Sequence, residues 1–428
     1  MSARKMSSLR QLSIMKRTFS VAIVLLGLVA SGWASEKNLI TFQGTNGSVP
    51  YGRLIFDKDG NLYGTTAFGG ANSCKCGLVF KLAPTSSGEW TETILYTFKG
   101  GSDGSTPTAG LIFDEAGTLY GTTFYGGSSN CLSGCGTVFR LRQDSNGAWS
   151  ERVLYQFGGG ADGANPNGSL VLDSLGNLYG TTSCTAGDCT ILGRGTAFKL
   201  THSSRVTWTE TVLHSFTVDG QDGLYPMAGL AFDRHGNLYG TTLEGGPGNL
   251  GTVFQLSPVG TGWNYSQIFT FGTLPSGGKW PYDSLIIGGK GKLYGATSAG
   301  GISKICIGGV EGCGTVFELS QDSNGIWTES VLHPFNGGSD GAGPIGSLAF
   351  DTKGNVYSTT AAGGDSACTG GCGTIVKLTQ SGGAWTEDVV FRFGLDTGWA
   401  PETGVVLDSQ GNLYGTTIER GVVFEFTP

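Results

Sequence analysis

One phrase recurs along this chain and limits the folds that it can adopt. The phrase is Gly-Asn-Leu-Tyr-Gly-Thr-Thr at residues 60–66, and its central Leu-Tyr or Val-Tyr pair begins at Leu62, Leu119, Leu178, Leu238, Leu293, Val356 and Leu413. Successive copies lie 57, 59, 60, 55, 63 and 57 residues apart. Seven copies at a nearly constant period predict a repeat architecture, in which each copy marks one structural unit.

The first unit contains four short stretches with the composition of β-strands. We expect strands at residues 52–57, 61–66, 77–82 and 90–98, which are rich in apolar, β-branched and aromatic residues. A tight turn at Asp57 to Gly60 joins the first two, because Asp bonds its own following backbone and Gly tolerates positive φ. Four antiparallel strands in about 58 residues, repeated seven times, predict an all-β fold, a seven-bladed β-propeller.

The two ends of the chain complete one blade. The last unit has candidate strands at residues 404–408, 412–417 and 421–426 but lacks a fourth. Residues 38–42 match the end of the fourth strand of the other units. Pairing this segment beside residues 421–426 would close the ring and leave no exposed blade edge. The alternative, a linear solenoid, needs capping units that the sequence does not show.

The repeated blocks resemble a known family. Gly-Asn-Leu-Tyr-Gly-Thr-Thr, then Gly-Gly, then Gly-Thr-Val-Phe at residues 136–139, 251–254 and 314–317 is similar to the GloVer tandem repeat of the choice-of-anchor tandem repeat GloVer-containing proteins. The resemblance covers nearly all of residues 38–428, and the hairpin is more loosely similar to that of NHL-type propellers. It implies a bacterial secreted or surface-displayed propeller without an assigned biochemical role.

The first 34 residues have the pattern of a signal peptide. Five basic residues and no acidic ones precede an apolar run at residues 19–28, and Gly32 and Ala34 suit cleavage before Ser35. An uncleaved membrane anchor is the alternative, although the run is short for a span. We therefore expect one propeller domain at residues 35–428, secreted, periplasmic or on the cell surface, with no transmembrane segment after cleavage.

Charge and cysteine content narrow the partners. Without residues 1–34, the chain keeps 21 of its 26 basic residues and all 33 acidic ones, a net charge of about −12, which argues against nucleic-acid binding. All ten cysteines lie between the second and third strands of their units, as Cys74/Cys76, Cys131/Cys135, Cys184/Cys189, Cys306/Cys313 and Cys368/Cys372. Local pairs in an exported chain predict disulfides, although Cys74 and Cys76 need a turn between them. Zinc is the alternative, but no loop holds four ligands, so we expect no metal or cofactor.

A second motif, Asp-Gly-x-x-Pro, precedes the first strand of several units. It begins at Asp103, Asp162, Asp222 and Asp340, and Asn46 begins a related copy. In a propeller these loops share a face with the cysteine loops. The motif suits an Asx-type turn with Pro fixing the entry to the strand. The functional alternative is a calcium ion bound by a ring of carboxylates near the axis, but each loop supplies only one carboxylate.

Several aromatic residues on the same predicted face have no place in the repeat. Trp280, Trp399 and Tyr225 precede prolines in these loops, and Phe68, Phe124 and Tyr125 lie between the second and third strands. Exposed rings favour stacking against a sugar or contact with a protein. The alternative is that they cap the ends of neighbouring blades. We expect a monomeric binding or scaffold module with an extracellular glycan or protein as partner.

Catalysis has little support in the sequence. None of the four histidines lies in a loop of that face, so neither a Ser-His-Asp triad nor a His-metal site has a centre. Glu244, Glu402 and Glu419 are acids outside the repeat that could serve a glycan-cleaving hydrolase or lyase. A purely structural component of the cell envelope is the third interpretation.

Overall fold

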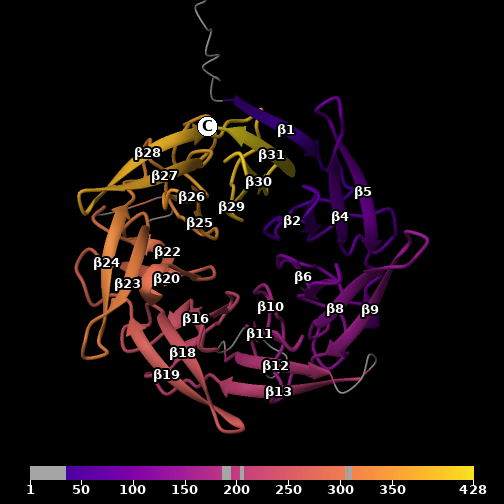
Figure 1. Cartoon of the computed structure of the whole chain (residues 1–428), viewed down its shortest axis with the longest axis horizontal. Coiled ribbons are helices and arrows are strands. Elements are labelled where there is room, and N and C mark those ends of the chain that lie inside the picture. The colour runs from indigo at the N-terminus through magenta and orange to yellow at the C-terminus, as the bar shows by residue number, and fades with distance from the viewer. Residues whose placement is uncertain (1–34, 186–193, 203–206, 304–305, 307–310) are drawn as a thin grey trace, which may run out of the picture. The chain divides into compact units, whose positions relative to one another are not determined.

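Residues Ala34–Pro428 form one compact unit in a computed structural model that describes residues 35–185, 194–202, 207–303, 306 and 311–428. Seven antiparallel blades stand around a central axis, as Figure 1 shows, which confirms the predicted seven-bladed β-propeller. The predicted signal peptide lies outside the described residues. Within them, no helix has the length and apolar character needed to cross a membrane.

Blades 1 to 3 each contain four strands in chain order. The strands are β2 (Ile55–Phe56), β3 (Leu62–Thr66), β4 (Leu78–Pro84) and β5 (Trp90–Thr97) in blade 1; β6 (Ile112–Phe113), β7 (Leu119–Thr123), β8 (Thr137–Gln143) and β9 (Trp149–Gln156) in blade 2; and β10 (Val171–Leu172), β11 (Leu178–Thr182), β12 (Thr196–His202) and β13 (Trp208–Ser215) in blade 3.

Blades 4 to 6 follow the same order with two additions near the loops. The strands are β15 (Ala231–Phe232), β16 (Leu238–Thr242), β18 (Thr252–Val259) and β19 (Gly262–Thr270) in blade 4, where β14 (Gly223–Leu224) also pairs with β17 (Glu244–Gly245); β20 (Gly278–Pro281), β21 (Ile286–Ile287), β22 (Leu293–Gly300), β23 (Thr315–Gln321) and β24 (Trp327–Pro334) in blade 5; and β25 (Ala349–Phe350), β26 (Val356–Thr360), β27 (Thr374–Ser381) and β28 (Ala384–Arg392) in blade 6. Two short 3-10 turns cover Gly101–Asp103 and Gly289–Gly291.

Blade 7 is built from both ends of the described chain. β29 (Val405–Leu407), β30 (Leu413–Thr417) and β31 (Val422–Thr427) come from the C-terminal end, and β1 (Ser35–Thr41) pairs antiparallel with β31 as the outer strand. The Phe42 amide then donates to the Gly421 carbonyl at 2.7 Å. The predicted closure by the N-terminal strand is confirmed, and the side-by-side strands are visible in Figure 1.

The repeated phrase forms a self-contained hairpin between the first two strands. In blade 1, one Asp57 oxygen accepts the Asp59 and Asn61 amides, each at 2.9 Å, and the other accepts the Tyr63 hydroxyl at 3.0 Å. The same bonds recur at Asp173 and Asp408. The motif therefore fixes a turn in the scaffold and leaves no carboxylate oxygen free for a ligand.

Stacked phenylalanines form the core between blades. Phe98, which follows β5, packs on Phe139 of the next blade with ring centroids 5.0 Å apart, and Phe42 closes the ring by packing on Phe80, also at 5.0 Å. The Phe80 ring lies over Gly64 of β3, where an added Cβ would come within 2.6 Å of Cζ. The glycine of the repeated phrase is therefore required by close approach to an aromatic ring.

The first strand of each unit is shorter than predicted. The sequence predicts residues 52–57 for blade 1, but only Ile55–Phe56 pair with the second strand. The residues before β2 instead contact the neighbouring blade, since the Pro50 carbonyl accepts the Thr416 hydroxyl of blade 7 at 2.9 Å. The segment between Pro50 and β2 consequently lines the central channel.

Candidate functional site

Two sets of loops share one face of the propeller. The loops that enter each blade pair with the loops between its second and third strands, through bridges such as Ser48 to Phe68 and Ser105 to Tyr125. In blade 4 the same pairing joins Leu224 to Glu244. The predicted common face exists, and we call it the loop face: the entry loops together with the loops between second and third strands.

The Asp-Gly-x-x-Pro motif acts as a turn. Asp103 accepts the Tyr96 hydroxyl at 2.6 Å and the Lys99 amide at 2.7 Å, and Asp162 repeats the pattern with Tyr155 and Gly158. These loop carboxylates are thus already bonded to the preceding blade. Among the described residues, no group of three or more His, Cys, Asp or Glu is close enough to hold a metal ion.

The residue before each of these prolines joins two blades. In blade 2, the Thr106 amide donates to the Cys76 carbonyl of blade 1 at 2.8 Å, and its carbonyl accepts the Phe124 amide of its own blade at 3.0 Å. Equivalent residues with φ between 54° and 62° are Val49, Asn165, Tyr225, Trp280, Gly343 and Ala400. A left-handed backbone costs free energy for any residue except glycine, so the repeated bonds hold these residues in place.

Two aromatic residues occupy this left-handed position in neighbouring blades. The Tyr225 carbonyl accepts the Leu243 amide at 3.0 Å, and the Trp280 amide donates to the Leu250 carbonyl at 2.8 Å. The Trp280 indole also donates to the Asn249 carbonyl at 3.4 Å. Tyr225 and Trp280 therefore flank one loop, that of blade 4 between β16 and β18, and both side chains are partly exposed.

The flanked loop supplies polar groups. Glu244 lies opposite Leu224, and the Asn249 side chain donates to its Oε2 at 3.4 Å. Glu244 is partly exposed, and Asn249 lies at the solvent-exposed end of the loop. We call Tyr225, Trp280, Glu244 and Asn249 the blade 4 cluster. Of the predicted site residues, this cluster unites Tyr225, Trp280 and Glu244.

The other predicted aromatics lie over different blades. Trp399 pairs with Glu419 in blade 7 and packs partly into that blade's core. Phe124 and Tyr125 of blade 2 touch edge to face at 4.7 Å, and Tyr125 is 37% exposed. Phe68 of blade 1 is 48% exposed. The six aromatics thus spread over five blades, and only the neighbouring residues Phe124 and Tyr125 and the pair Tyr225 and Trp280 gather locally.

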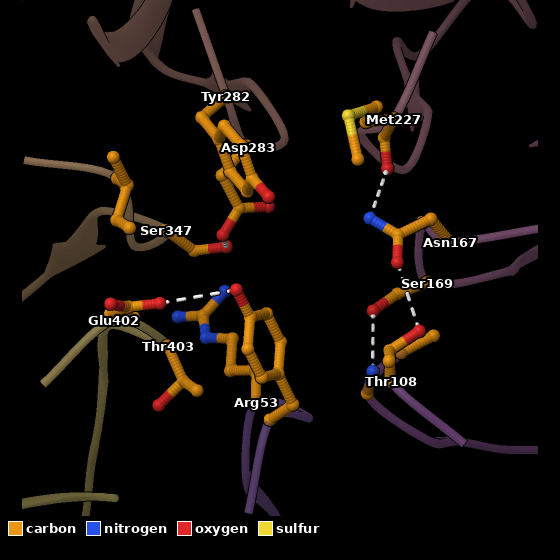
Figure 2. Close-up of a pocket in the computed structure, with 15 residues that line it drawn as sticks. Arg53, Thr108, Asn167, Ser169, Met227, Tyr282, Asp283, Ser347, Glu402 and Thr403 are labelled. Carbon is orange, nitrogen blue, oxygen red and sulfur yellow. Dashed lines mark hydrogen bonds between the residues drawn. The ribbon is translucent and has the colours of Figure 1, made fainter. Parts of the chain in front are cut away.

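A polar cluster that the sequence interpretation missed lies in the central channel. Figure 2 shows Arg53, Tyr282, Asp283, Ser347 and Glu402 on one side of the cavity. They come from blades 1, 5, 6 and 7, and each lies within three residues after the proline of its entry loop. Of this group, only Glu402 was predicted as a site residue. The others were missed because they lie far from Glu402 along the chain and approach it only in the folded ring.

The cluster connects blade 1 to blades 6 and 7. The Arg53 guanidinium donates to the Leu348 and Val405 carbonyls at 3.3 and 3.1 Å. The Tyr51 hydroxyl donates to Glu402 at 3.1 Å. Ser347 donates to Asp283 at 2.7 Å, which links blades 6 and 5. The Tyr51 and Arg53 bonds thus join the first blade to the last two, beside the seam at which the two ends of the described chain meet.

Burial shifts the ionisation of this cluster. It raises the pKa of Glu402, an effect that the Tyr51 hydrogen bond opposes and the nearby Glu419 carboxylate increases. Burial also lowers the pKa of Arg53, while Asp283 favours its charged form. Raised carboxyl pKa values in a cavity are a common feature of general acids, although buried structural networks show them too.

The volume of the channel cavity shows whether Glu402 could act as a general acid on a ligand or belongs to a buried structural network. Across from the charged cluster, Thr108 donates to Asn167 at 2.9 Å, and Met227 completes a neutral wall (Figure 2). The cavity measures about 50 Å³. A water needs about 10–15 Å³, whereas ligand pockets commonly measure about 300–1,000 Å³. This cavity therefore has room for a few waters and is too small for a sugar ring.

Four of the predicted cysteine pairs fall within the described residues. Cys74–Cys76, Cys131–Cys135, Cys306–Cys313 and Cys368–Cys372 are disulfides, with Cα atoms 5.1 to 5.2 Å apart. The Cys184–Cys189 pair cannot be placed, because Cys189 lies outside the described residues. The disulfides tighten the loops of the loop face next to the entry loops, since Gly337 approaches the Cys306–Cys313 sulfurs closely.

Comparisons with known proteins agree with the fold and the repeat. A family model described as the Gloeobacter/Verrucomicrobia repeat matches residues 30–230 and 183–322, as the motif resemblance predicts. A search of curated proteins found no match.

Solved structures with the same fold are distant in sequence. A possible 6-phosphogluconolactonase from Bacteroides uniformis is 16% identical, with a TM-score of 0.50 over 80% of this chain and 86% of the other. An ancestral GH74 enzyme is 13% identical, with a TM-score of 0.56 over 92% of this chain and 51% of the other. At these identities the similarity establishes the propeller fold alone.

Proposed function

The chain belongs to the Gloeobacter/Verrucomicrobia repeat family, and on that premise we propose that it is an exported binding module whose loop face contacts extracellular glycan. The propeller and the repeat family fit a binding or scaffold module. The glycan and the position of its site are our proposal. Local disulfides on this face suit an oxidising compartment outside the cytoplasm.

The blade 4 cluster carries this proposal. Gly343 fills the equivalent left-handed position in blade 6, so the scaffold does not require an aromatic ring there. Tyr225 and Trp280 nevertheless place large rings on strained backbone in adjoining blades, with Glu244 and Asn249 between them. Rings beside acceptor and amide groups suit a sugar, whose apolar face stacks while its hydroxyls form hydrogen bonds. Trp399, Phe68, Phe124 and Tyr125 remain proposed contacts for a longer chain or a protein partner.

A glycan array followed by tryptophan fluorescence titration tests the proposal. We expect a defined group of glycans to bind and to change the emission, with affinity reduced at least tenfold in Trp280→Gly. Glycine is chosen because φ is 59° at this position, so the substitution removes the ring without adding backbone strain. An array without specific binding contradicts the glycan, and specific binding that Trp280→Gly and Tyr225→Gly leave intact contradicts the site.

A glycan-cleaving enzyme is a second candidate because burial raises the pKa of Glu402 beside a cavity. The small volume of the channel cavity disfavours it, whereas Glu419 on the loop face is exposed and Glu244 is partly exposed. Incubation with a panel of polysaccharides, followed by assay for new reducing or unsaturated ends, distinguishes the candidates. Cleavage activity would establish the enzyme if it is abolished by Glu402→Gln, Glu244→Gln or Glu419→Gln. If no new ends form, the binding module is the candidate that remains.

A further inference from the structure

Most blades have one partly or fully buried glutamate at the same position of their outer strand. Each of these residues pairs with a leucine of the third strand in blades 1 to 6 and with Phe426 in blade 7. They are Glu92, Glu151, Glu210, Glu329 and Glu387, with Tyr265 in place of glutamate in blade 4 and Glu36 of β1 in blade 7. In each of the six glutamates, one carboxyl oxygen is buried without a hydrogen-bond partner among the described residues. Such a group is costly unless a proton or donor satisfies it.

Blade 4 shows what this position does. Tyr265 replaces the glutamate and donates its hydroxyl to Asp222 of the entry loop at 2.6 Å. Asp222 also accepts the Thr217 amide at 3.0 Å. The loop carboxylate is therefore the hydrogen-bond acceptor in this blade, and the outer strand supplies the donor. Because a tyrosine hydroxyl keeps its proton at neutral pH, this contact persists across the ordinary pH range.

Blades 1 and 5 reverse the roles. In blade 1 the Asn46 amide of the entry loop donates to Glu92 at 3.1 Å. In blade 5 the Gly278 amide donates to Glu329 at 3.0 Å. In these blades the entry loop supplies the hydrogen-bond donor, and an ionised glutamate can accept the hydrogen bond.

Blades 2 and 3 place a carboxyl group on both sides. Asp103 already accepts two donors, the Tyr96 hydroxyl and the Lys99 amide. Glu151 shares a side-chain hydrogen bond with Asp103. Glu210 pairs with Leu200 at the equivalent position of blade 3, and its carboxyl group interacts with Asp162 through charge alone. Two carboxylates cannot bond each other, so one proton must remain for the contact to form.

We propose that the entry loops of blades 2 and 3 are latched to the outer strands by protons, held by Glu151 toward Asp103 and by Glu210 toward Asp162. Each protonated glutamate takes the place of Tyr265. When the proton is lost, two carboxylates face each other and the loop is released from the strand. The latch makes part of the loop face sensitive to pH, independently of what ligand that face binds.

The surrounding charges agree with the latch. Burial and then Asp103 raise the pKa of Glu151 to about 8, against a smaller opposing effect of Lys99. Burial and then Asp162 raise the pKa of Glu210 to about 7. Tyr96 and Tyr155 bond the two aspartates and are neutral. In blade 6 burial also raises the pKa of Glu387, an effect that His333 and Arg392 oppose and that Asp340 and Asp388 increase.

The sign of the linkage follows from the raised values. The folded state holds these protons more tightly than the unfolded chain, whose glutamates have the ordinary value of 4.5. The stabilisation is complete below pH 4.5 and is lost as pH rises through about 7 and 8. At pH 6 unfolding should release about two protons from this pair of glutamates, one from each.

Proton release on unfolding tests the proposal. We expect Glu151→Gln/Glu210→Gln to release about two protons fewer than the wild type at pH 6, because the amides donate permanently. The slope of unfolding free energy against pH gives this number. Glu115→Gln, an exposed acid of blade 2, is the matched control and should leave it unchanged. Equal proton release in wild type and double variant overturns the proposal.

A second readout needs no substitution. Infrared spectra of the wild type should contain a protonated-carboxyl band at pH 6 that disappears by pH 9, and its absence overturns the proposal even where the variants do not fold. Hydrogen exchange locates the effect: protection of the Gly104 and Gly163 amides should fall at least tenfold from pH 6 to pH 9. Protection of the Gly223 amide beside Tyr265 should not change, and equal loss at all three sites contradicts the latch.

Discussion

Ser358 lies directly opposite Val376 in blade 6, at the two positions that glycine and phenylalanine fill in every other blade. In blade 1 the equivalent pair is Gly64 and Phe80, where the ring occupies the space of a Cβ atom. The smaller valine in blade 6 makes room for the serine side chain. The repeat therefore contains an internal compensation between neighbouring strands.

This compensation predicts energetic coupling in blade 1. Gly64→Ser should lower the free energy of unfolding by about 1–3 kcal/mol, since Cβ and Oγ would overlap the Phe80 ring. In the background of Phe80→Val that penalty should fall by about 1 kcal/mol or more. Urea unfolding of the four proteins of the cycle measures the coupling. Additive effects would show that the two positions are independent.

Phe42 should contribute strongly to ring closure. Phe42→Ala removes the contact with Phe80 at the seam and should cost about 3–5 kcal/mol in the free energy of unfolding. Thr41→Ala, a change at the exposed last residue of β1, should cost less than about 0.5 kcal/mol. A Phe42→Ala protein with wild-type stability would contradict the importance of this closure.

Arg53 should act as a structural residue of the channel. Arg53→Met leaves Asp283 without its nearby cation and frees two carbonyls, so we expect a loss of about 3 kcal/mol. Arg142→Met on the exposed surface of β8 serves as the control. Chemical denaturation measures both. Unchanged stability in Arg53→Met would mean that the cluster does not hold the seam.

The small disulfide loops should each stabilise the fold modestly. Cys368→Ser/Cys372→Ser opens a loop with a sequence separation of 4, and the chain-entropy model gives about 2 kcal/mol for such a loop. The variant should remain folded, because the core phenylalanines of blade 7 stay in place. Thermal unfolding with and without reductant checks this. A variant that is unfolded under native conditions would contradict a local role.

The sequence predicts most of the architecture because the repeat encodes it locally. Leu62 and Tyr63 mark the second strand of the first unit. Because the last unit lacks a fourth strand, the sequence also predicts that the N-terminal segment, β1, completes blade 7. The first strand is shorter than predicted, since Gly52 and its neighbours turn into the channel rather than pairing. Periodicity does not distinguish residues that pair within a blade from residues that contact the next one.

The channel and the latch could not be predicted in the same way. Arg53 and Asp283 are far apart in the chain and meet only when the ring closes. One signal was available: the residue just after the loop proline differs between units, as Tyr51, Thr108 and Glu402 illustrate. Glu151 escapes notice for the opposite reason, since its conservation among the units makes it look like part of the scaffold.

Paired glycine variants provide the most direct measurement of the central claim, that the blade 4 cluster binds glycan. Trp280→Gly and Val49→Gly change equivalent left-handed positions, with φ of 59° and 56°, but only the first removes an aromatic ring. Calorimetric titration with the tightest glycan from the array should show at least tenfold weaker binding for Trp280→Gly and unchanged binding for Val49→Gly. Equal affinities of the two variants would contradict the proposed site.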